Sequence, residues 1–327
     1  MHAAARPLFM PSPESRLTAA IWGQFLGDAA SLGSHWIYDL EELKRRFPGG
    51  VQGFETPATG HYHEGKQGGD FTHYGDAALL LLESLAACGG GFRESDFGVR
   101  LTGFFGSSIC KSYRDHATQE ALERMAADPD NFQNGASDDQ PATVTRLAPL
   151  VAAYQKRPTE EMLDAVRRLT RVTQNHPTAL GCAAAHAVLL RQLLEGLPFM
   201  TAFENTRKSR EVSCDGSDYF EFAHMLREFD AETATGRFGQ GCPLPQSLPS
   251  ALHAACRHHE DFTTAILATL RAGGDSAGRA AMIGTWMGAV HGMEGIPADW
   301  LSRLNARERI QKALDQLYAR LGVEWRA

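Results

Sequence analysis

Acidic, imidazole and hydroxyl side chains gather at four places in the chain, each where an apolar segment begins or ends. The first place is Gly27-Asp28-Ala29, which continues to Gly33-Ser34-His35-Trp36. On a continuing helix, the seven-residue separation puts Asp28 and His35 on one face, two turns apart. This spacing makes Asp28 a candidate catalytic carboxylate and His35 a candidate metal ligand. A buried aspartate that caps or hydrogen-bonds a neighbouring loop is an equally good interpretation of Asp28.

The second place is Gly68 to Asp76, directly before the apolar run from Ala77 to Leu82. Asp76 stands where the N-cap of a helix is expected, and capping alone would account for it. Capping does not account for Thr72-His73-Tyr74. A hydroxyl, an imidazole and a phenol against a helix N-terminus can form a site for an anion, a metal ion or both.

The third and fourth places combine acids with small residues. The segment 134–140 contains Ser137, Asp138 and Asp139, and acids in such a loop are usually solvated or cap the next helix. Gly273-Gly274-Asp275 precedes a run of small residues. Its glycines permit close approach of the backbone to a ligand, and they suit a tight turn equally well.

Helices must position these clusters, because the apolar residues of the chain recur at helical spacing. Ser12-Pro13-Glu14 supplies an N-cap, a proline at the first helical position and an early acid, and predicts a helix over about 13–32. Alternating β-type runs are nearly absent, so we predict an all-α fold. Close packing of helix backbones is predicted by Gly23, Gly27, Gly284 and Gly288. Further helices are predicted over about 77–88, 93–107, 115–126, 141–156, 158–173, 177–195, 218–228, 248–258, 260–272, 277–292 and 304–321.

The composition, with 43% hydrophobic residues, is that of a globular chain able to bury a large core. A net charge of -7 over 327 residues argues against a general attraction to nucleic acid or to an anionic membrane. No apolar stretch reaches the roughly 20 residues that span a bilayer, and no secretory h-region follows Arg6. The six cysteines are scattered without a C-x-x-C pair, which favours buried thiols. We therefore expect a cytoplasmic protein with a single domain over 1–327, because no segment has the character of a linker.

The order of these motifs resembles the ADP-ribosylglycohydrolase family. The resemblance covers about residues 16–295 and is followed by the helix expected at about 304–321. Within the family, the segments 32–38, 72–76 and 238–242 look closest to the branch that includes the jellyfish J-crystallins. The motifs that carry the resemblance are Gly27-Asp28-Ala29, the polar tetrad before the helix that ends Glu83-Ser84-Leu85, Asn134-Gly135 with Arg146-Leu147-Ala148-Pro149-Leu150, Gln174-Asn175-His176-Pro177, and Gly273-Gly274-Asp275.

The resemblance implies a compact orthogonal multi-helix bundle with a central cleft, where two Mg²⁺ or Mn²⁺ ions bind ribose and orient a water at its anomeric carbon. Mg²⁺ requires hard oxygen ligands, which histidine does not supply, so a two-magnesium site is not expected here. The alternatives are no metal at all, or one softer ion such as Zn²⁺ or Mn²⁺. Its ligands would be His35, Thr72, His73 and Asp275, with Asp76 as an alternative. The family's ligand positions fall on His35, which stands in place of a glutamate, on Thr72, His73, Tyr74 and Gly75, and on Asp275, Ala277 and Gly278, where Ala277 and Gly278 stand in place of an acid and a threonine.

Two classes of function follow from the resemblance. The first is a divergent hydrolase that acts on an ADP-ribosyl substrate, small or attached to protein, or on a related ribosyl or N-glycosidic substrate. The second is a catalytically silent member that binds a nucleotide-like ligand or has a structural, crystallin-like role. Hydrolysis of a small amide is a third and weaker hypothesis. For the hydrolase, the catalytic candidates are Asp28, His73, Asp76 and Asp275, with His73 or Asp76 as the base, and the substrate-binding candidates are Tyr74, Ser137, Asp138, Asp139 and Asn175.

Several other polar and aromatic residues have a structural interpretation first. Asn175 lies between two predicted helices, and Pro177 starts the second of them, which favours a turn over ligand contact. Arg146 lies in an apolar segment and is expected to pair with a buried acid. Trp36 and Trp286 can stack on a base, but tryptophans at such spacing are more often part of the core. The sequence carries no signal of oligomeric state.

Overall fold

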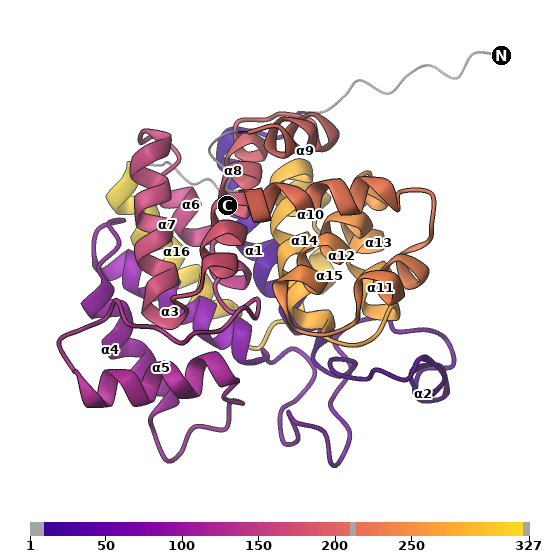
Figure 1. Cartoon of the computed structure of the whole chain (residues 1–327), viewed down its shortest axis with the longest axis horizontal. Coiled ribbons are helices and arrows are strands. Elements are labelled where there is room, and N and C mark those ends of the chain that lie inside the picture. The colour runs from indigo at the N-terminus through magenta and orange to yellow at the C-terminus, as the bar shows by residue number, and fades with distance from the viewer. Residues whose placement is uncertain (1–9, 210–213, 323–327) are drawn as a thin grey trace.

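The computed structural model describes residues 10–209 and 214–322, and within these ranges it is built from helices (Figure 1). The predicted all-α fold is confirmed, because β-pairing in these ranges is limited to two isolated bridges. The α-helices are α1 Pro13–Ser31, α2 Leu40–Arg46, α3 His73–Ala87, α4 Glu94–Phe105, α5 His116–Ala127, α6 Ala148–Ala153, α7 Thr159–Thr173, α8 Pro177–Leu194, α9 Phe199–Arg207, α10 Cys214–Met225, α11 Ala231–Phe238, α12 Leu244–His258, α13 Phe262–Arg271, α14 Ser276–His291, α15 Ala298–Ser302 and α16 Arg307–Leu321, with two 3-10 helices, η1 Val144–Arg146 and η2 Met293–Gly295.

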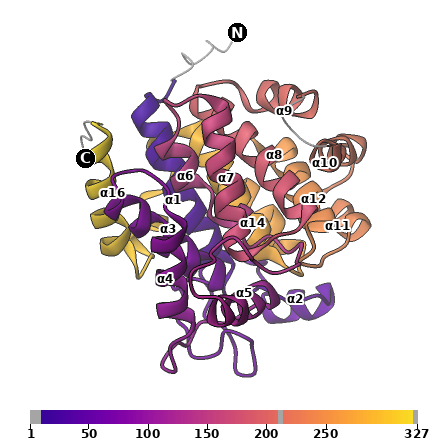
Figure 2. The same ribbon diagram turned by 60° about the vertical axis from the view of Figure 1, so that its left-hand side comes forward.

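Helices α1 and α14 pack against each other through the middle of the molecule, with α3 to α7 and α16 on one side and α9 to α13 on the other (Figure 1; Figure 2 gives a second view). Both are buried along almost their whole length. Their backbones touch, because a Cβ on Gly23 would collide with the carbonyl oxygen of Gly284, and one on Gly27 with that of Ala280. The predicted glycine packing is confirmed. It holds the C-terminal end of α1 beside the N-terminal end of α14.

Capping side chains set the starts of the helices that carry the site. Ser12 caps α1 by accepting the N–H of Ser15 at 3.0 Å, as predicted. The prediction that Asp76 caps the next helix is wrong, because α3 begins at His73 and Thr72 is its N-cap. The hydroxyl of Thr72 accepts the N–H of Tyr74 at 3.2 Å. The polar run 72–74 is therefore the first turn of the helix and not a loop in front of it.

Other helix extents also differ from the expectation. The segment 141–156, predicted as one helix, is a turn followed by η1 and the six-residue α6. Pro149 lacks the N–H that a continuous helix would need at that position. Helices α2, α9, α11 and α15 were not predicted; each has nine residues or fewer, too few to show a helical period.

The C-terminal helix α16 is part of the same core. It packs on α3 and buries Ile310, Leu314 and Leu317. On its buried side the hydroxyl of Tyr318 lies 2.8 Å from the hydroxyl of Thr18 on α1. Among residues 10–209 and 214–322, no helix has the length and hydropathy needed to cross a bilayer.

Candidate functional site

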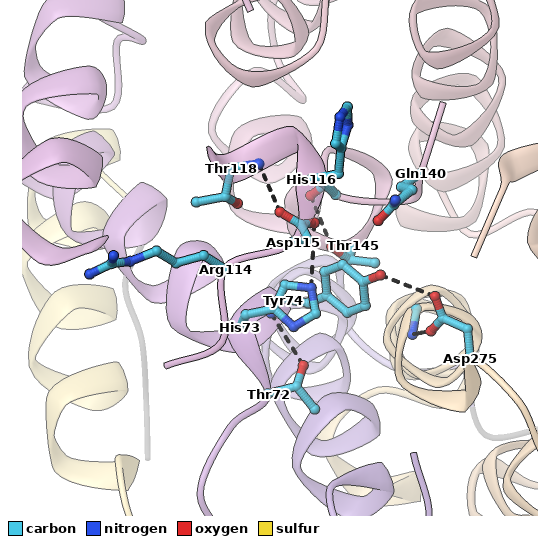
Figure 3. A network of polar contacts seen from close by, with 12 residues as sticks. Thr72, His73, Tyr74, Arg114, Asp115, His116, Thr118, Gln140, Thr145 and Asp275 are labelled. Atoms are coloured by element: carbon cyan, nitrogen blue, oxygen red, sulfur yellow. Dashed lines mark hydrogen bonds and ion pairs between the residues drawn. The ribbon is translucent and has the colours of Figure 1, made fainter. Parts of the chain in front are cut away.

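Three helix N-termini meet beside the end of α1 (Figure 3). Thr72 caps α3, Asp115 caps α5 and Asp275 caps α14. All three capping side chains are buried. Capping side chains are hydrogen-bond acceptors and helix N-termini carry partial positive charge, so polar groups concentrate where such termini converge. The convergence brings together the first, second and fourth of the sequence clusters.

Asp275 connects these clusters by direct contacts. Its Oδ1 accepts the N–H of Gly278 at 3.2 Å and lies 3.6 Å from Nδ1 of His35, and its Oδ2 accepts the hydroxyl of Tyr74 at 3.1 Å. Nδ1 of His35 in turn accepts the N–H of Ala277 at 3.2 Å, which leaves the proton on Nε2. Burial lowers the pKa of His35 well below its ordinary value and raises the pKa of Tyr74 well above its own. At neutral pH His35 is therefore uncharged and Tyr74 is a hydrogen-bond donor.

His73 and Asp115 form a second pair in the same place (Figure 3). Nε2 of His73 lies 3.4 Å from Oδ2 of Asp115, and both side chains are 2% exposed. Oδ1 of Asp115 accepts the N–H of Thr118 at 2.8 Å. Burial opposes the ionisation of Asp115, but the contacts with His73 and Thr118 outweigh it and lower the pKa of this carboxyl to about 2. An ionised carboxylate therefore faces a buried imidazole, the arrangement that orients histidine bases in many hydrolases.

Asp28 lies beneath the start of α3. Its Oδ2 accepts the backbone N–H of Thr72 at 2.9 Å, and its Oδ1 accepts the hydroxyl of the same residue. Burial raises the pKa of Asp28 to about 6. Gly75 makes room for it, because a Cβ at that position would collide with Oδ2 of Asp28. Both oxygens of Asp28 hold the first turn of α3, which is the structural interpretation considered for this residue.

A third buried histidine, His63, completes a cluster with His35 and His73. Its ring centroid lies 5.7 Å from that of His35 and 5.9 Å from that of His73, and all three rings stack on or beside Trp36. Burial lowers the pKa of His63 to about 2. Both ring nitrogens of His63 and of His73, Nε2 of His35 and Oδ2 of Asp115 have no hydrogen-bond partner among the described residues. So many unpaired buried polar atoms mark a place for water or a ligand.

Asp76 lies apart from this cluster. Its Oδ2 lies 2.7 Å from Nζ of Lys66, which also donates to the carbonyl of Phe71 at 2.6 Å. Asp76 lines a separate cleft with Lys66, Lys111 and neighbouring residues, and that lining includes neither His73 nor Asp275. The ion pair anchors the segment before α3 to the first turn of that helix.

The predicted substrate-binding loop runs beside α5. Asp138 is buried and accepts Nδ1 of His116 at 3.0 Å and the N–H of Gln140 at 2.8 Å. Burial raises the pKa of its carboxyl. Nε2 of Gln174 donates to the carbonyl of Gln140 at 2.7 Å and so holds the loop in place. Asp139 is half-buried next to it.

Two other candidates for substrate binding are at the surface. The side chains of Ser137 and Asn175 are exposed. The backbone of Asn175 donates to the carbonyl of Ala136 at 2.8 Å, in the bridged turn between α7 and α8. The turn interpretation of this segment agrees with that pairing.

The residues at the family's ion-binding positions do not fit two magnesium ions. The hydroxyl of Thr72 is bonded to Asp28, both oxygens of Asp275 are occupied, and Nδ1 of His35 accepts a backbone N–H. A Cβ on Gly278, where the family has a threonine, would lie 2.8 Å from Cγ of Pro141. Within residues 10–209 and 214–322, no three His, Cys, Asp or Glu side chains are arranged to hold a metal ion. In this structure the side chains at these positions are engaged in hydrogen bonds within the chain.

Sequence reasoning missed Asp115 and His63. Asp115 precedes His116-Ala117-Thr118 and so has the pattern of an N-cap, a signal that was available at the start of the helix predicted over 115–126. His63 lies in a segment without periodicity, so nothing in the sequence indicates its burial. Arg146, expected to pair with an acid, instead donates Nε to the carbonyl of Ala142 at 2.6 Å. Trp286 is core, as expected for its spacing, whereas Trp36 is half-exposed at the site.

This geometry defines the class of protein. It is an all-α protein with a buried polar site where the ends of α1, α3, α5 and α14 converge. The family model for ADP-ribosylglycohydrolase matches residues 10–326, and the chain belongs to the ADP-ribosylglycohydrolase family.

Among individual proteins, the chain is similar to Crystallin J1A of Tripedalia cystophora, with 27% identity over 93% of this chain and 96% of the crystallin. It is 23% identical to the ADP-ribosyl-[dinitrogen reductase] glycohydrolase of Rhodospirillum rubrum over 47% of this chain and 48% of that one. A solved structure described as an ADP-ribosylglycohydrolase-related protein complex superposes with a TM-score of 0.72 at 26% identity, over 94% of this chain and 99% of the other.

Proposed function

We propose that the chain is a hydrolase of a ribosyl glycosidic bond, in an ADP-ribosyl or related N-glycosidic substrate, with His73 as the general base. The observation that carries the proposal is the pair formed by His73 and Asp115, 3.4 Å apart and buried at the convergence of three helix N-termini. Asp115 is a positioning residue that holds the imidazole and stabilises it once it is protonated. Membership of the family supports the reaction class.

His73, Asp275 and Tyr74 have separate roles in the proposed reaction. His73 takes a proton from a water whose oxygen attacks the anomeric carbon, while the bond from that carbon to the leaving nitrogen breaks. The proton then passes from the imidazolium to the leaving nitrogen. The carboxylate of Asp275, held by Tyr74, stabilises the positive charge that develops on the sugar ring. No step depends on a metal ion.

The experiment is an assay of product release from a panel of ADP-ribosylated and N-ribosyl compounds by the purified full-length chain. We expect His73→Gln and Asp115→Asn each to lower kcat by about a hundredfold or more. Because Asp115 orients His73, the double variant should lose no more than the worse of the two singles. His224→Gln is the matched control, since His224 is a partly exposed histidine on α10 near Glu204. Absence of turnover on the whole panel, or full activity of Asp115→Asn, would overturn the proposal.

A second candidate is a silent family member that binds a nucleotide-like ligand or has a structural role. It is favoured by the loss of the family's ligand residues, two acids at His35 and Ala277 and a threonine at Gly278, and by similarity to a crystallin over almost the whole of both chains. Calorimetry with ADP-ribose, run beside the turnover assay, separates the two. Binding without turnover supports the silent member.

A further inference from the structure

Three aromatic rings from three separate segments stand at steep angles to one another beside the histidine cluster. Trp36 follows α1, Tyr62 lies between α2 and α3, and Tyr113 lies between α4 and α5. The ring of Trp36 is 5.0 Å from that of Tyr62 at 81° and 4.8 Å from that of Tyr113 at 71°, and the two tyrosine rings are 5.7 Å apart at 77°. The three ring planes are steeply inclined to one another, and we call the arrangement of Trp36, Tyr62 and Tyr113 the aromatic corner.

The backbone at Trp36 is held in an uncommon conformation that fixes one wall of this corner. Its φ of 61° is in the left-handed region, which costs a non-glycine residue about 1 kcal/mol or more. The N–H of Trp36 donates to the carbonyl of Gly274 at 2.8 Å, and its indole stacks on the ring of His35 at 4.1 Å. Strain that persists because its surroundings enforce it points to a functional position.

A carboxylate lies near the corner, and the side chains of Arg114 and Lys66 are engaged elsewhere. Asp115, two residues from Tyr113, is buried, and its Oδ2 lies 3.4 Å from Nε2 of His73. The guanidinium of Arg114 is turned away to the carbonyl of Ser107 at 3.0 Å (Figure 3). The ammonium of Lys66 is neutralised by Asp76.

We propose that Trp36, Tyr62 and Tyr113 form a recognition corner for a methylated ammonium cation. Aromatic faces attract such cations within about 6 Å of the ring centroid, and several faces together with nearby carboxylates are the usual means of recognising them. Tyr62 is 66% exposed, so a ligand reaches the corner from solvent. The inference rests on the proposed function in one respect. The corner would lie beside the proposed hydrolase site and select substrates that carry a cationic group.

The test compares two probes that have the same shape and differ in charge. The full-length chain is titrated calorimetrically with choline and with 3,3-dimethylbutan-1-ol, in which carbon replaces the ammonium nitrogen, at matched ionic strength. We expect choline to bind at least about tenfold more tightly than the neutral alcohol. Guanidinium chloride at low concentration, as a third probe, should bind more weakly than choline. Equal affinity for choline and the alcohol, or no heat from choline up to about a hundred millimolar, would overturn the inference.

Variants of the two tyrosines show where choline binds. Tyr62→Leu and Tyr113→Leu should each weaken choline binding about fivefold to tenfold, whereas Tyr62→Phe and Tyr113→Phe, which keep the ring, should bind it as the native chain does. Phe222→Leu is the control, since Phe222 is a 46% exposed aromatic residue on α10. Unchanged binding by Tyr62→Leu would show that choline sits elsewhere. If Tyr113→Leu unfolds the chain, Tyr62→Leu still tests the inference, because the exposed Tyr62 tolerates leucine. None of these measurements requires turnover, so failure of the hydrolase proposal is detected separately.

Discussion

Asp28 is a buried carboxylate whose ionisation opposes folding. Burial raises its pKa from 3.8 to about 6, so in this window the folded chain holds a proton that the unfolded chain has released. Stability therefore falls as the pH rises through the window and stays lower above it. A shift of about two pKa units corresponds to roughly 3 kcal/mol.

We expect the free energy of unfolding of the native chain, measured against that of Asp28→Asn, to fall by about 2–3 kcal/mol between pH 4 and pH 7. Urea unfolding of both proteins at the two pH values measures this, and subtraction of the variant removes the contribution of other titrating groups. Asn keeps one acceptor for Thr72, so the variant should fold. A difference that stays constant or rises with pH would show that Asp28 is not held in this way.

Gly278 is packed closely against Pro141. The threonine that the resemblance implies at this position would bring its Cβ to 2.8 Å from Cγ of Pro141. We expect Gly278→Thr to lower the free energy of unfolding by about 2 kcal/mol through overpacking. Pro141→Ala should recover part of the loss in the double variant, because it removes the colliding atom. Thermal unfolding of the four proteins in this cycle gives the coupling, and additive effects would contradict it.

At the residue level, the sequence motifs predicted the identity of the polar side chains at the site better than the contacts that these side chains make. The meeting of His35, Tyr74 and Asp275 follows from motif order and the resemblance, because helix termini bring these segments together. The contact between His73 and Asp115 could not be predicted, since it depends on how the loop after α4 folds back onto α3. Asp76 was placed in the site because spacing alone does not tell which side of a first turn a carboxylate faces.

The pair of helices α1 and α14 is the element that positions half of the site. Their glycines bring backbone against backbone, so even one added methyl group has no space. We expect Gly284→Ala to lower the free energy of unfolding by about 3 kcal/mol, at the upper end of overpacking effects, because its Cβ would collide with the carbonyl oxygen of Gly23. Chemical denaturation measures the loss.

Gly103→Ala on α4 is the control for this prediction. Gly103 is exposed inside a helix, and a Cβ there would meet no atom within 4 Å. Alanine should therefore raise the free energy of unfolding by about 0.5–1 kcal/mol. Equal effects of the two alanines would mean that α1 and α14 do not pack as closely as described.

Helix bounds were predicted correctly where a helix is long enough for its apolar residues to show several helical periods. The helix over about 13–32 was predicted within one residue, because a capping serine, a first-turn proline and several apolar periods agree. Only Leu147 separates η1 from the six-residue α6, and proline at 149 lies near their junction. Sequence periodicity could not separate this arrangement from one continuous helix, because buried residues continue through both pieces.

At the scale of the whole molecule, segments from opposite ends of the chain share one core. Helix α1 packs on α14, and α16 packs on α3 and reaches α1 through Tyr318 and Thr18. The motif order predicted that distant segments meet, but neither periodicity nor composition could place α16 against α1. A boundary between independent domains would have to cut across these contacts.

We therefore expect the full chain to unfold as one cooperative unit, with a single calorimetric transition and a ratio of calorimetric to van't Hoff enthalpy near one. Tyr318→Phe removes the buried bond to Thr18, which is worth about 1 kcal/mol, and should shift the whole transition down by about 1–2 °C without splitting it. If the chain consisted of two independent units, the native profile would show two peaks and the variant would move only one. Scanning calorimetry of the two proteins decides between these outcomes, because a contact between the two ends of one cooperative core affects the unfolding of all of it.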